Sequence, residues 1–162
     1  MKKQSVSGRF AIVANAYAQN APSADWAAVK QLMTSTQVVN IAAAIRSLNP
    51  QDADYEEKKT KMKKQLPCIT VHACGFTDGK RSNATAIDNG LACIDIDHLT
   101  ADEGRALLNA LTPELCNEHG IIYVARSIST YGIWMLAERG HGERVTATQI
   151  RLQHVLNQLV NG

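Results

Sequence analysis

Apolar residues spaced three or four positions apart predict several helices along the chain. Residues 38–48 carry such a stripe, and it ends before Pro50 because a proline restricts the residue that precedes it. Ser23 is the expected N-cap of an earlier helix, and Thr100 with Glu103 has the spacing of a capping box. These signals predict helices over residues 23–33, 38–48, 101–111, 113–119 and 143–159.

Short apolar runs bounded by turn residues predict the strands. They cover residues 6–14, 68–71, 91–97, 121–125 and 131–137, of which the last two are expected to pair as a hairpin. Residues 82–90 are expected to form a flexible polar loop. Because helices and strands mix without strict alternation, the predicted class is α+β, a mainly antiparallel sheet with helices packed on it, in one domain over residues 1–162.

Residues 52–64 are densely charged, with acidic residues first and five lysines after them. Mixed charges of this kind usually form a solvated helix. The alternative is a rim that contacts phosphates, because lysines grip a nucleic-acid backbone without reading its sequence.

Composition narrows the class of protein further. The chain has 162 residues, of which 45% are hydrophobic and 20% charged, and its net charge is +2. These values are typical of a globular domain and exclude the broad basic surface of a protein that coats duplex DNA, so any nucleic-acid contact is expected to be local. No apolar run approaches the roughly 20 residues that cross a bilayer, so we expect no membrane contact.

The cysteines and the N-terminal apolar run both favour a cytoplasmic protein. The four cysteines show no metal-type spacing, so we expect reduced and mostly buried thiols. The apolar run over residues 10–14 is shorter than the core of a secretory signal and is better explained as a strand.

The strand over residues 91–97 carries two carboxylates. Its period of two places Asp95 and Asp97 on one face, roughly 6–7 Å apart at the backbone, while Ile94 and Ile96 face the core. Adjacent carboxylates repel each other, and a hard cation such as Mg²⁺ or Mn²⁺ relieves that repulsion while accepting phosphate oxygens. The alternative is that the two aspartates only end a strand and cap the following helix.

A second candidate is the serine-rich turn over residues 127–132, Ser-Ile-Ser-Thr-Tyr-Gly. Hydroxyls and backbone N–H groups in a glycine-containing turn can hold a phosphate, and Arg126 stands beside them. Turns of this composition are also common in ordinary hairpins.

An Asp-x-Asp strand, a capped helix and a strand that ends in Ser-x-Ser-x-x-Gly together resemble the N-terminal domain family of VirE-type proteins of bacterial mobile elements. That family is a branch of the archaeo-eukaryotic primase-like superfamily. The resemblance covers about residues 10–159, and its surrounding signals include the lysine-rich segment, the Leu66-Pro67 step and the run from Gly90 to Asp97.

The resemblance implies an RRM-like primase-polymerase core and two-metal nucleotidyl transfer. Asp95 and Asp97 would then be catalytic residues that ligate the metal. Nucleotide would be bound by Arg126, Ser127, Ser129, Gly132 and Trp134. The implied partners are nucleotides or single-stranded nucleic acid during replication or transfer of a mobile element, with a helicase fused to the chain or encoded downstream.

Two departures from the family pattern leave enzymatic activity open. Trp134 stands where the family has a basic residue, and a further acidic strand is missing, so we expect a fragment of a longer protein or an incomplete site. The alternatives are a degenerate nucleic-acid-binding module, in which Trp134 stacks on a base, and a protein-interaction module.

Overall fold

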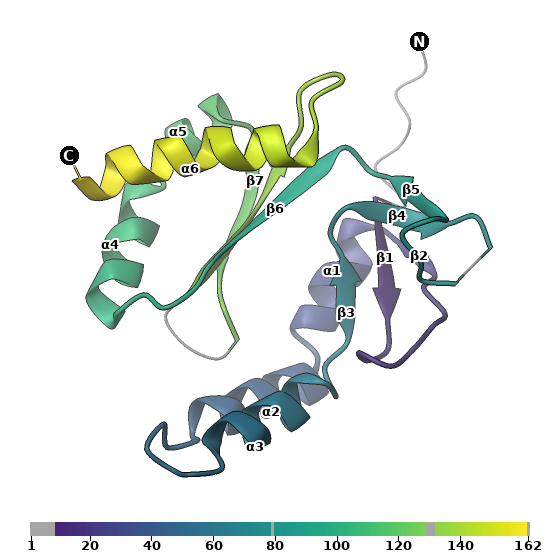
Figure 1. Cartoon of the computed structure of the whole chain (residues 1–162), viewed down its shortest axis with the longest axis vertical. Coiled ribbons are helices and arrows are strands. Elements are labelled where there is room, and N and C mark those ends of the chain that lie inside the picture. The colour runs from purple at the N-terminus through teal and green to yellow at the C-terminus, as the bar shows by residue number, and fades with distance from the viewer. Residues whose placement is uncertain (1–8, 79, 129–131, 162) are drawn as a thin grey trace. The chain divides into compact units, whose positions relative to one another are not determined.

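Figure 1 shows the computed structural model of the chain, which describes residues 9–78, 80–128 and 132–161. It comprises two compact units, residues 1–89 and 90–162. Each unit combines helices with antiparallel strands, so the α+β class is confirmed. The expectation of one domain over the whole chain stays a prediction.

The first unit contains two small antiparallel sheets. Strands β1 (Phe10–Val13), β2 (Ser23–Ala24) and β3 (Cys68–Thr70) form one sheet in the order β2-β1-β3. Strands β4 (Ala73–Phe76) and β5 (Ala86–Asp88) form the other. The predicted loop over residues 82–90 is therefore wrong in part, because residues 86–88 form a strand that pairs with β4. This pairing depends on a distant segment and could not be predicted from residues 86–88 alone.

Three helices complete the first unit, namely α1 (Trp26–Met33), α2 (Thr36–Arg46) and α3 (Tyr55–Lys63). The predicted N-cap at Ser23 is wrong. Ser23 lies in β2 opposite Ala11, and the Asp25 carboxylate caps α1 by accepting a hydrogen bond of 2.8 Å from the Ala28 N–H. Both residue types cap helices well, and pairing with β1 removes Ser23 from that role.

The second unit is a three-stranded sheet with helices packed against it. Strands β6 (Leu91–Ile96), β7 (Ile121–Arg126) and β8 (Ile133–Glu138) lie in the order β6-β8-β7, each antiparallel to its neighbour. Helices α4 (Ala101–Ala110) and α5 (Pro113–Glu118) connect β6 to β7, and α6 (Val145–Asn161) follows β8. Strands β6 and β7 therefore run parallel on either side of β8, and the predicted hairpin of β7 and β8 is confirmed.

Two predicted helix boundaries of this unit rest on observed caps. The Thr100 hydroxyl and the Glu103 carboxylate form the expected capping box at the start of α4. Gly120 ends the turn after α5 with a φ of 67°, in the left-handed region that glycine occupies without strain. Strand β6 consequently feeds directly into α4, which fixes the position of the residues between them.

The core of the second unit lies between its sheet and α4 and α6. Apolar side chains from all three elements are buried there, with Ile133 and Met135 of the central strand fully excluded from solvent. The other buried members of the cluster are Leu107, Leu111, Ile121, Ala137, Leu152 and Leu156. Ile94 and Ile96 of β6 pack against this cluster, as the strand alternation predicts.

The four cysteines are free thiols, as predicted, but the expectation that most are buried is wrong, because each is only half-buried. In the parts of the chain that the structure describes, no helix is long and apolar enough to cross a membrane.

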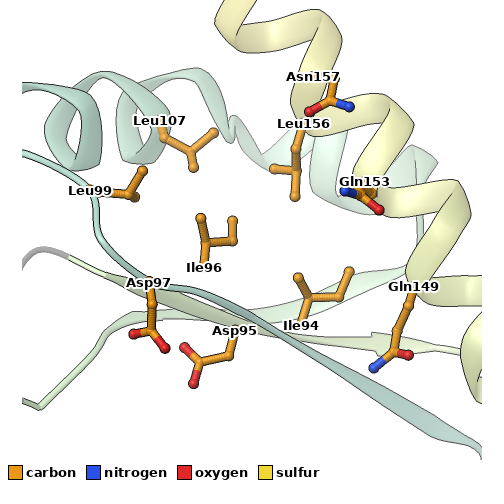
Figure 2. Close-up of a pocket in the computed structure, with 10 residues that line it drawn as sticks. All are labelled: Ile94, Asp95, Ile96, Asp97, Leu99, Leu107, Gln149, Gln153, Leu156 and Asn157. Atoms are coloured by element: carbon orange, nitrogen blue, oxygen red, sulfur yellow. The ribbon is translucent and has the colours of Figure 1, made fainter.

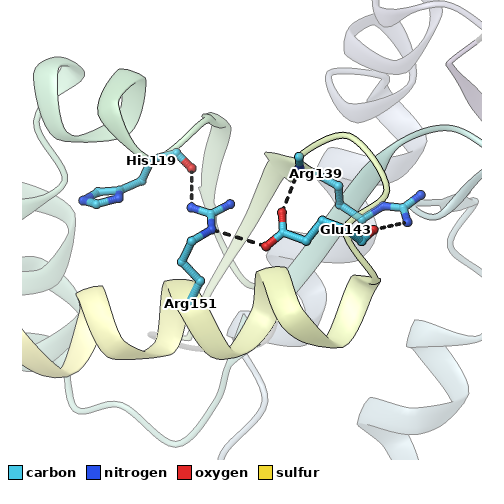
Figure 3. A network of polar contacts seen from close by, with 5 residues as sticks. His119, Arg139, Glu143 and Arg151 are labelled. Atoms are coloured by element: carbon cyan, nitrogen blue, oxygen red, sulfur yellow. Dashed lines mark hydrogen bonds and ion pairs between the residues drawn. The ribbon is translucent and has the colours of Figure 1, made fainter.

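A polar network joins the start of α6 to the loops beside it (Figure 3). The Gly140 N–H donates to Oε2 of Glu143 at 2.8 Å, and the Arg151 guanidinium lies 3.6 Å from Oε1. Arg151 also donates to the carbonyl oxygen of His119 at 3.0 Å, and Arg139 donates to the carbonyl oxygen of Glu143. The Gly140 hydrogen bond, followed by smaller contributions that include the Arg151 charge, lowers the pKa of Glu143 below its ordinary value of 4.5.

Replacing Glu143 by glutamine is expected to make the second unit less stable at neutral pH but not in acid. A carboxyl whose pKa is lower in the folded state stabilises the fold above its unfolded pKa, and that stabilisation is lost as the pH falls through the folded pKa. Urea unfolding of wild type and Glu143→Gln, measured at neutral pH and well below pH 4.5, tests this. A difference in midpoint that stays constant across this range would contradict it.

Candidate site on the outer face of the sheet of the second unit

Asp95 and Asp97 lie at the end of β6 and are both exposed. Figure 2 shows their carboxylates on one side of the strand, while the side chains of Ile94 and Ile96 point to the other side, toward α4 and α6. This is the placement that a period of two predicts. The outer face, as we call the face of the sheet that carries Asp95, therefore presents two neighbouring carboxylates.

Strand register adds two aromatic residues to the outer face. Asp95 lies directly opposite Trp134 on β8, and residues opposite each other in antiparallel strands share a face. The ring of Tyr123 on β7 lies 5.2 Å from that of Trp134, with the ring planes tilted by 51°. Tyr123 was missed by the sequence prediction, although the same period of two along β7 places it on one face with Ser127.

The end of β6 and the start of β8 lie close together at Gly132. A Cβ atom at this position would lie 2.8 Å from the carbonyl oxygen of Ile96, 3.1 Å from Oγ of Ser127 and 3.2 Å from Oδ1 of Asp97. The Ser127 N–H also donates to the Gly132 carbonyl oxygen at 2.6 Å. The missing side chain of Gly132 therefore lets the Ser127 hydroxyl and the Asp97 carboxylate converge on one small volume.

The hydroxyl of Ser127 is buried, and it has no hydrogen-bond partner among the described residues. A buried polar group without a partner costs about 1–3 kcal/mol, so its presence calls for an explanation. It lies beside an exposed carboxylate at the end of a strand, where a polar ligand would supply the missing partner. Ser127 is thus a second observation at this site, independent of the two acids.

The other predicted site residues are placed differently. Arg126 lies opposite Ile133, so strand alternation directs it to the face of the sheet opposite Asp95, and the register does not bring it to the outer face. Ser129 lies outside the described residues. His98 follows Asp97 directly and was not among the predicted site residues. It is exposed and has a φ of 61°, a left-handed conformation that costs a non-glycine residue about 1–2 kcal/mol.

A cavity of about 550 Å³ lies on the helix side of β6 (Figure 2). Its walls combine aliphatic side chains with three amides from α6, and the Gln149 amide donates to the Cys93 carbonyl oxygen at 2.8 Å. The residues that line it are Ile94, Asp95, Ile96, Asp97, Leu99, Leu107, Gln149, Gln153, Leu156 and Asn157. Asp95 and Asp97 are among these residues because β6 forms one wall of the cavity. Their carboxylates, however, point away from Ile94 and Ile96, to the other side of β6.

Comparison with known proteins decides the family. The model of the family described as "BT4734-like, N-terminal domain" matches residues 61–159, which are 99 of the 162 residues. The chain belongs to the BT4734-like N-terminal domain family. No curated protein and no solved structure was found to match the chain.

The expected VirE-type, primase-like family is therefore wrong, because the matching family model is the BT4734-like one. That resemblance depended on an Asp-x-Asp strand and a serine-glycine turn. Both motifs are short, and each follows from ordinary strand and hairpin chemistry, so together they do not separate one family from another. The match to the BT4734-like family covers the strands and helices of the second unit up to residue 159, including the outer face.

Cys93 of this BT4734-like domain is a thiol rather than a thiolate at neutral pH. Burial, with a further contribution from the Asp95 charge two residues away, raises the pKa of Cys93 to about 11. The thiolate is the form that binds metals and attacks electrophiles, so Cys93 is not expected to do either.

The donors of the outer face fit a hard cation only in part. Among the described residues of this BT4734-like domain, no group of three or more His, Cys, Asp and Glu side chains is placed to hold a metal ion. Two carboxylates are enough for Mg²⁺, which usually keeps several waters and is bound through one or two carboxylates together with the phosphates of a substrate. The residues therefore fit a cation that is held jointly by protein and ligand.

Proposed function

We propose that the outer face binds a divalent cation, Mg²⁺ or Mn²⁺, together with the phosphate group of a nucleotide or of a single-stranded nucleic-acid end. Asp95 and Asp97 are the proposed metal ligands, and Ser127 with the backbone at Gly132 contacts phosphate. One observation carries the proposal, namely the convergence of the Asp97 carboxylate and the unpartnered Ser127 hydroxyl on Gly132.

The charges of the site support joint binding of cation and phosphate. Without a metal ion, the carboxylates of Asp95 and Asp97 repel the like charge of a phosphate. A bound cation, when present, neutralises the carboxylates and supplies positive charge toward phosphate oxygens. A hydroxyl donor beside that charge adds a charge-assisted hydrogen bond.

The aromatic pair supports a nucleotide rather than inorganic phosphate as the ligand. Trp134 shares the outer face with Asp95 and is half-buried beside Tyr123. An indole that keeps part of its ring accessible stacks on a nucleobase without regard to sequence. The proposed ligand thus joins a phosphate, a cation and a base on one face.

Binding and catalysis remain separate proposals for this site. Nucleotidyl transfer would require attack of a 3′-hydroxyl oxygen on the α-phosphorus with departure of pyrophosphate, a reaction that two metal ions accelerate. At this end of the outer face the described residues place two carboxylates, and the aromatic Trp134 rather than a basic residue lies opposite Asp95. These features favour a binding module, and labelled-nucleotide incorporation on a single-stranded template is the assay that distinguishes the two.

The finer expectations about fold and setting also stay proposals. The order β6, α4, β7, β8, α6 is compatible with part of an RRM-like core, because a split β-α-β unit brings two parallel strands to either side of a third. A cytoplasmic location and a helicase partner would suit a protein that handles nucleic-acid ends.

Binding of a fluorescent nucleoside triphosphate tests the proposed function. We expect affinity that appears with Mg²⁺ or Mn²⁺ and disappears with a chelator, because the aspartates repel the phosphates when no cation is present. Ser127→Ala is expected to weaken nucleotide binding while leaving Mn²⁺ affinity without nucleotide unchanged. Nucleotide binding that is equally strong in chelator would overturn the proposal.

A further inference from the structure

A basic surface surrounds an exposed tyrosine in the first unit. Tyr17 is 70% exposed, and Nζ of Lys64 lies 5.9 Å from the centroid of its ring. We propose that this surface, formed by Tyr17, Lys64 and Arg81, binds single-stranded nucleic acid by stacking a base on Tyr17 and contacting phosphates with the two neighbouring cations. This goes beyond the proposed function and does not depend on the metal site.

Backbone contacts hold the loop of Tyr17 between the two sources of positive charge. The Ala16 N–H donates to the Lys64 carbonyl oxygen at 3.2 Å, and the Arg81 guanidinium donates to the Ala16 carbonyl oxygen at 3.2 Å. The Arg81 N–H donates to the Gln19 carbonyl oxygen at 2.9 Å. Segments that are far apart in sequence are thereby joined around one exposed ring.

The tip of the loop has its own internal support. The side-chain oxygen of Asn15 accepts hydrogen bonds from the N–H groups of Tyr17 and Ala18, at 2.9 and 3.1 Å. An aromatic platform on a backbone fixed in this way loses little conformational entropy when a base stacks on it. The exposed ring of Tyr17 is therefore held ready for a flat ligand.

The charge around this surface is strongly one-sided. Residues 1–24 include no acidic residue, and the segment from Lys58 to Arg81 has seven basic residues and one acidic residue, Asp78. The Lys80 backbone N–H and, less strongly, the Lys80 charge lower the pKa of Asp78, so Lys80 has an acidic neighbour and is not counted in the proposed surface. This local excess is consistent with a chain whose net charge is only +2.

The lysines of α3 divide into two groups. Lys58 and Lys59, in the middle of the helix, form ion pairs with Asp54 and Glu56. Lys63 and Lys64, at the C-terminal end, form no ion pair with another described residue. Lysines at the C-terminal end of a helix interact favourably with the helix dipole. This explains why the two lysines are there, but it does not explain the exposed ring beside Lys64.

Single-stranded nucleic acid is the partner that this combination fits best. Every base has a flat face that stacks on an aromatic ring, and the phosphates on either side of it meet cations. An acidic protein segment would use the lysines but would gain nothing from an aromatic ring in preference to another apolar side chain. A duplex hides the faces of its bases within the helical stack.

Fluorescence anisotropy of a labelled oligo-dT of about 15 nucleotides, in low salt and chelator with the whole chain, tests the proposal. Tyr17→Ala is expected to weaken binding about tenfold, whereas Tyr17→Phe, which keeps the ring, retains it. Lys64→Ala is expected to weaken binding and to reduce the slope of log K against log salt by about 0.7, the value for one lost phosphate contact.

Lys58→Ala is the matched control, because it removes one lysine of the same helix whose ammonium is paired with Asp54 at 2.8 Å. It is expected to leave affinity and salt slope nearly unchanged. An equal loss in Lys58→Ala and Lys64→Ala, no loss in Tyr17→Ala, equal affinity for a duplex, or no binding at low salt would each overturn the proposal.

The two proposals fail separately. Chelator removes the proposed metal-dependent binding on the outer face but leaves the Tyr17 surface unaffected. Asp95→Asn with Asp97→Asn is accordingly expected to retain oligo-dT binding in chelator. A loss of that binding in the aspartate variant would overturn the independence of the Tyr17 surface.

Discussion

Replacing Asp95 and Asp97 together by asparagine is expected to abolish metal-dependent nucleotide binding. Asparagine keeps the size of each side chain but removes the two negative charges that attract the cation. Loss of outer-shell groups alone costs metal sites 10–100-fold, so loss of both proposed ligands is expected to cost at least about 100-fold in affinity for Mn²⁺. Isothermal titration of each variant with Mn²⁺, with and without nucleotide, measures this directly.

The same substitution is not expected to unfold the chain. Both aspartates are exposed, and asparagine keeps the size and the side-chain oxygen acceptor of each. Urea unfolding should therefore show nearly unchanged stability in the double variant. Glu138→Gln, which removes an exposed carboxylate at the other end of the sheet, is the matched control and should keep full Mn²⁺ affinity. Equal Mn²⁺ affinity in wild type and the aspartate variant would contradict the metal assignment.

Gly132→Ala is expected to lower the free energy of unfolding by about 1–3 kcal/mol, the cost of forcing a side chain into a packed site. The new Cβ would lie 2.8 Å from the Ile96 carbonyl oxygen, a contact with backbone that no rotation of a side chain relieves. Strands β6 and β8 would have to separate locally. Because the same Cβ approaches Asp97 and Ser127, nucleotide binding is expected to weaken as well.

Gly75→Ala provides the control for this prediction. A Cβ atom at Gly75 would meet only Cδ1 of Ile87, at 3.7 Å, which is an ordinary van der Waals contact. Urea unfolding of both variants should therefore show a clearly larger loss for Gly132→Ala. A Gly132→Ala variant within about 0.5 kcal/mol of wild type, the range of ordinary surface substitutions, would contradict the close approach of the two strands.

Local sequence signals were sufficient to predict the part of the site that lies on β6. The alternation along residues 91–97 predicts that Asp95 and Asp97 share a face opposite Ile94 and Ile96, and this follows from strand geometry alone. The start of α4 is equally local, since its capping box needs only Thr100 and Glu103. The hairpin of β7 and β8 was likewise visible as two apolar runs joined by a polar turn.

Features that depend on pairing between distant segments were not predictable in this way. Ser23 and Asp25 are both good caps, and the pairing of Ser23 with Ala11 decides between them. Strand β5 forms because β4 provides partners for residues with little strand preference of their own. The approach of Gly132 to Ile96 depends on the register of β6 and β8, which no single segment encodes.

The same limit explains the wrong family assignment. Two short motifs identified the expected chemistry of an acidic strand and a serine turn, whereas family membership depends on the pattern of residues over 61–159 as a whole. Arg126 illustrates the difference, because its position beside the serine turn in sequence does not bring it to the outer face once the register of β7 is known.

Electron paramagnetic resonance of Mn²⁺ tests the central claim most directly. Free Mn²⁺ gives a six-line signal that is lost on binding, so titration of the protein into Mn²⁺ with a nucleoside triphosphate reports the cation on the outer face. We expect wild type to remove more of the signal than nucleotide alone, and the Asp95→Asn, Asp97→Asn variant to remove no more than nucleotide alone. An identical loss of signal in both proteins would contradict the claim that these two carboxylates hold a divalent cation.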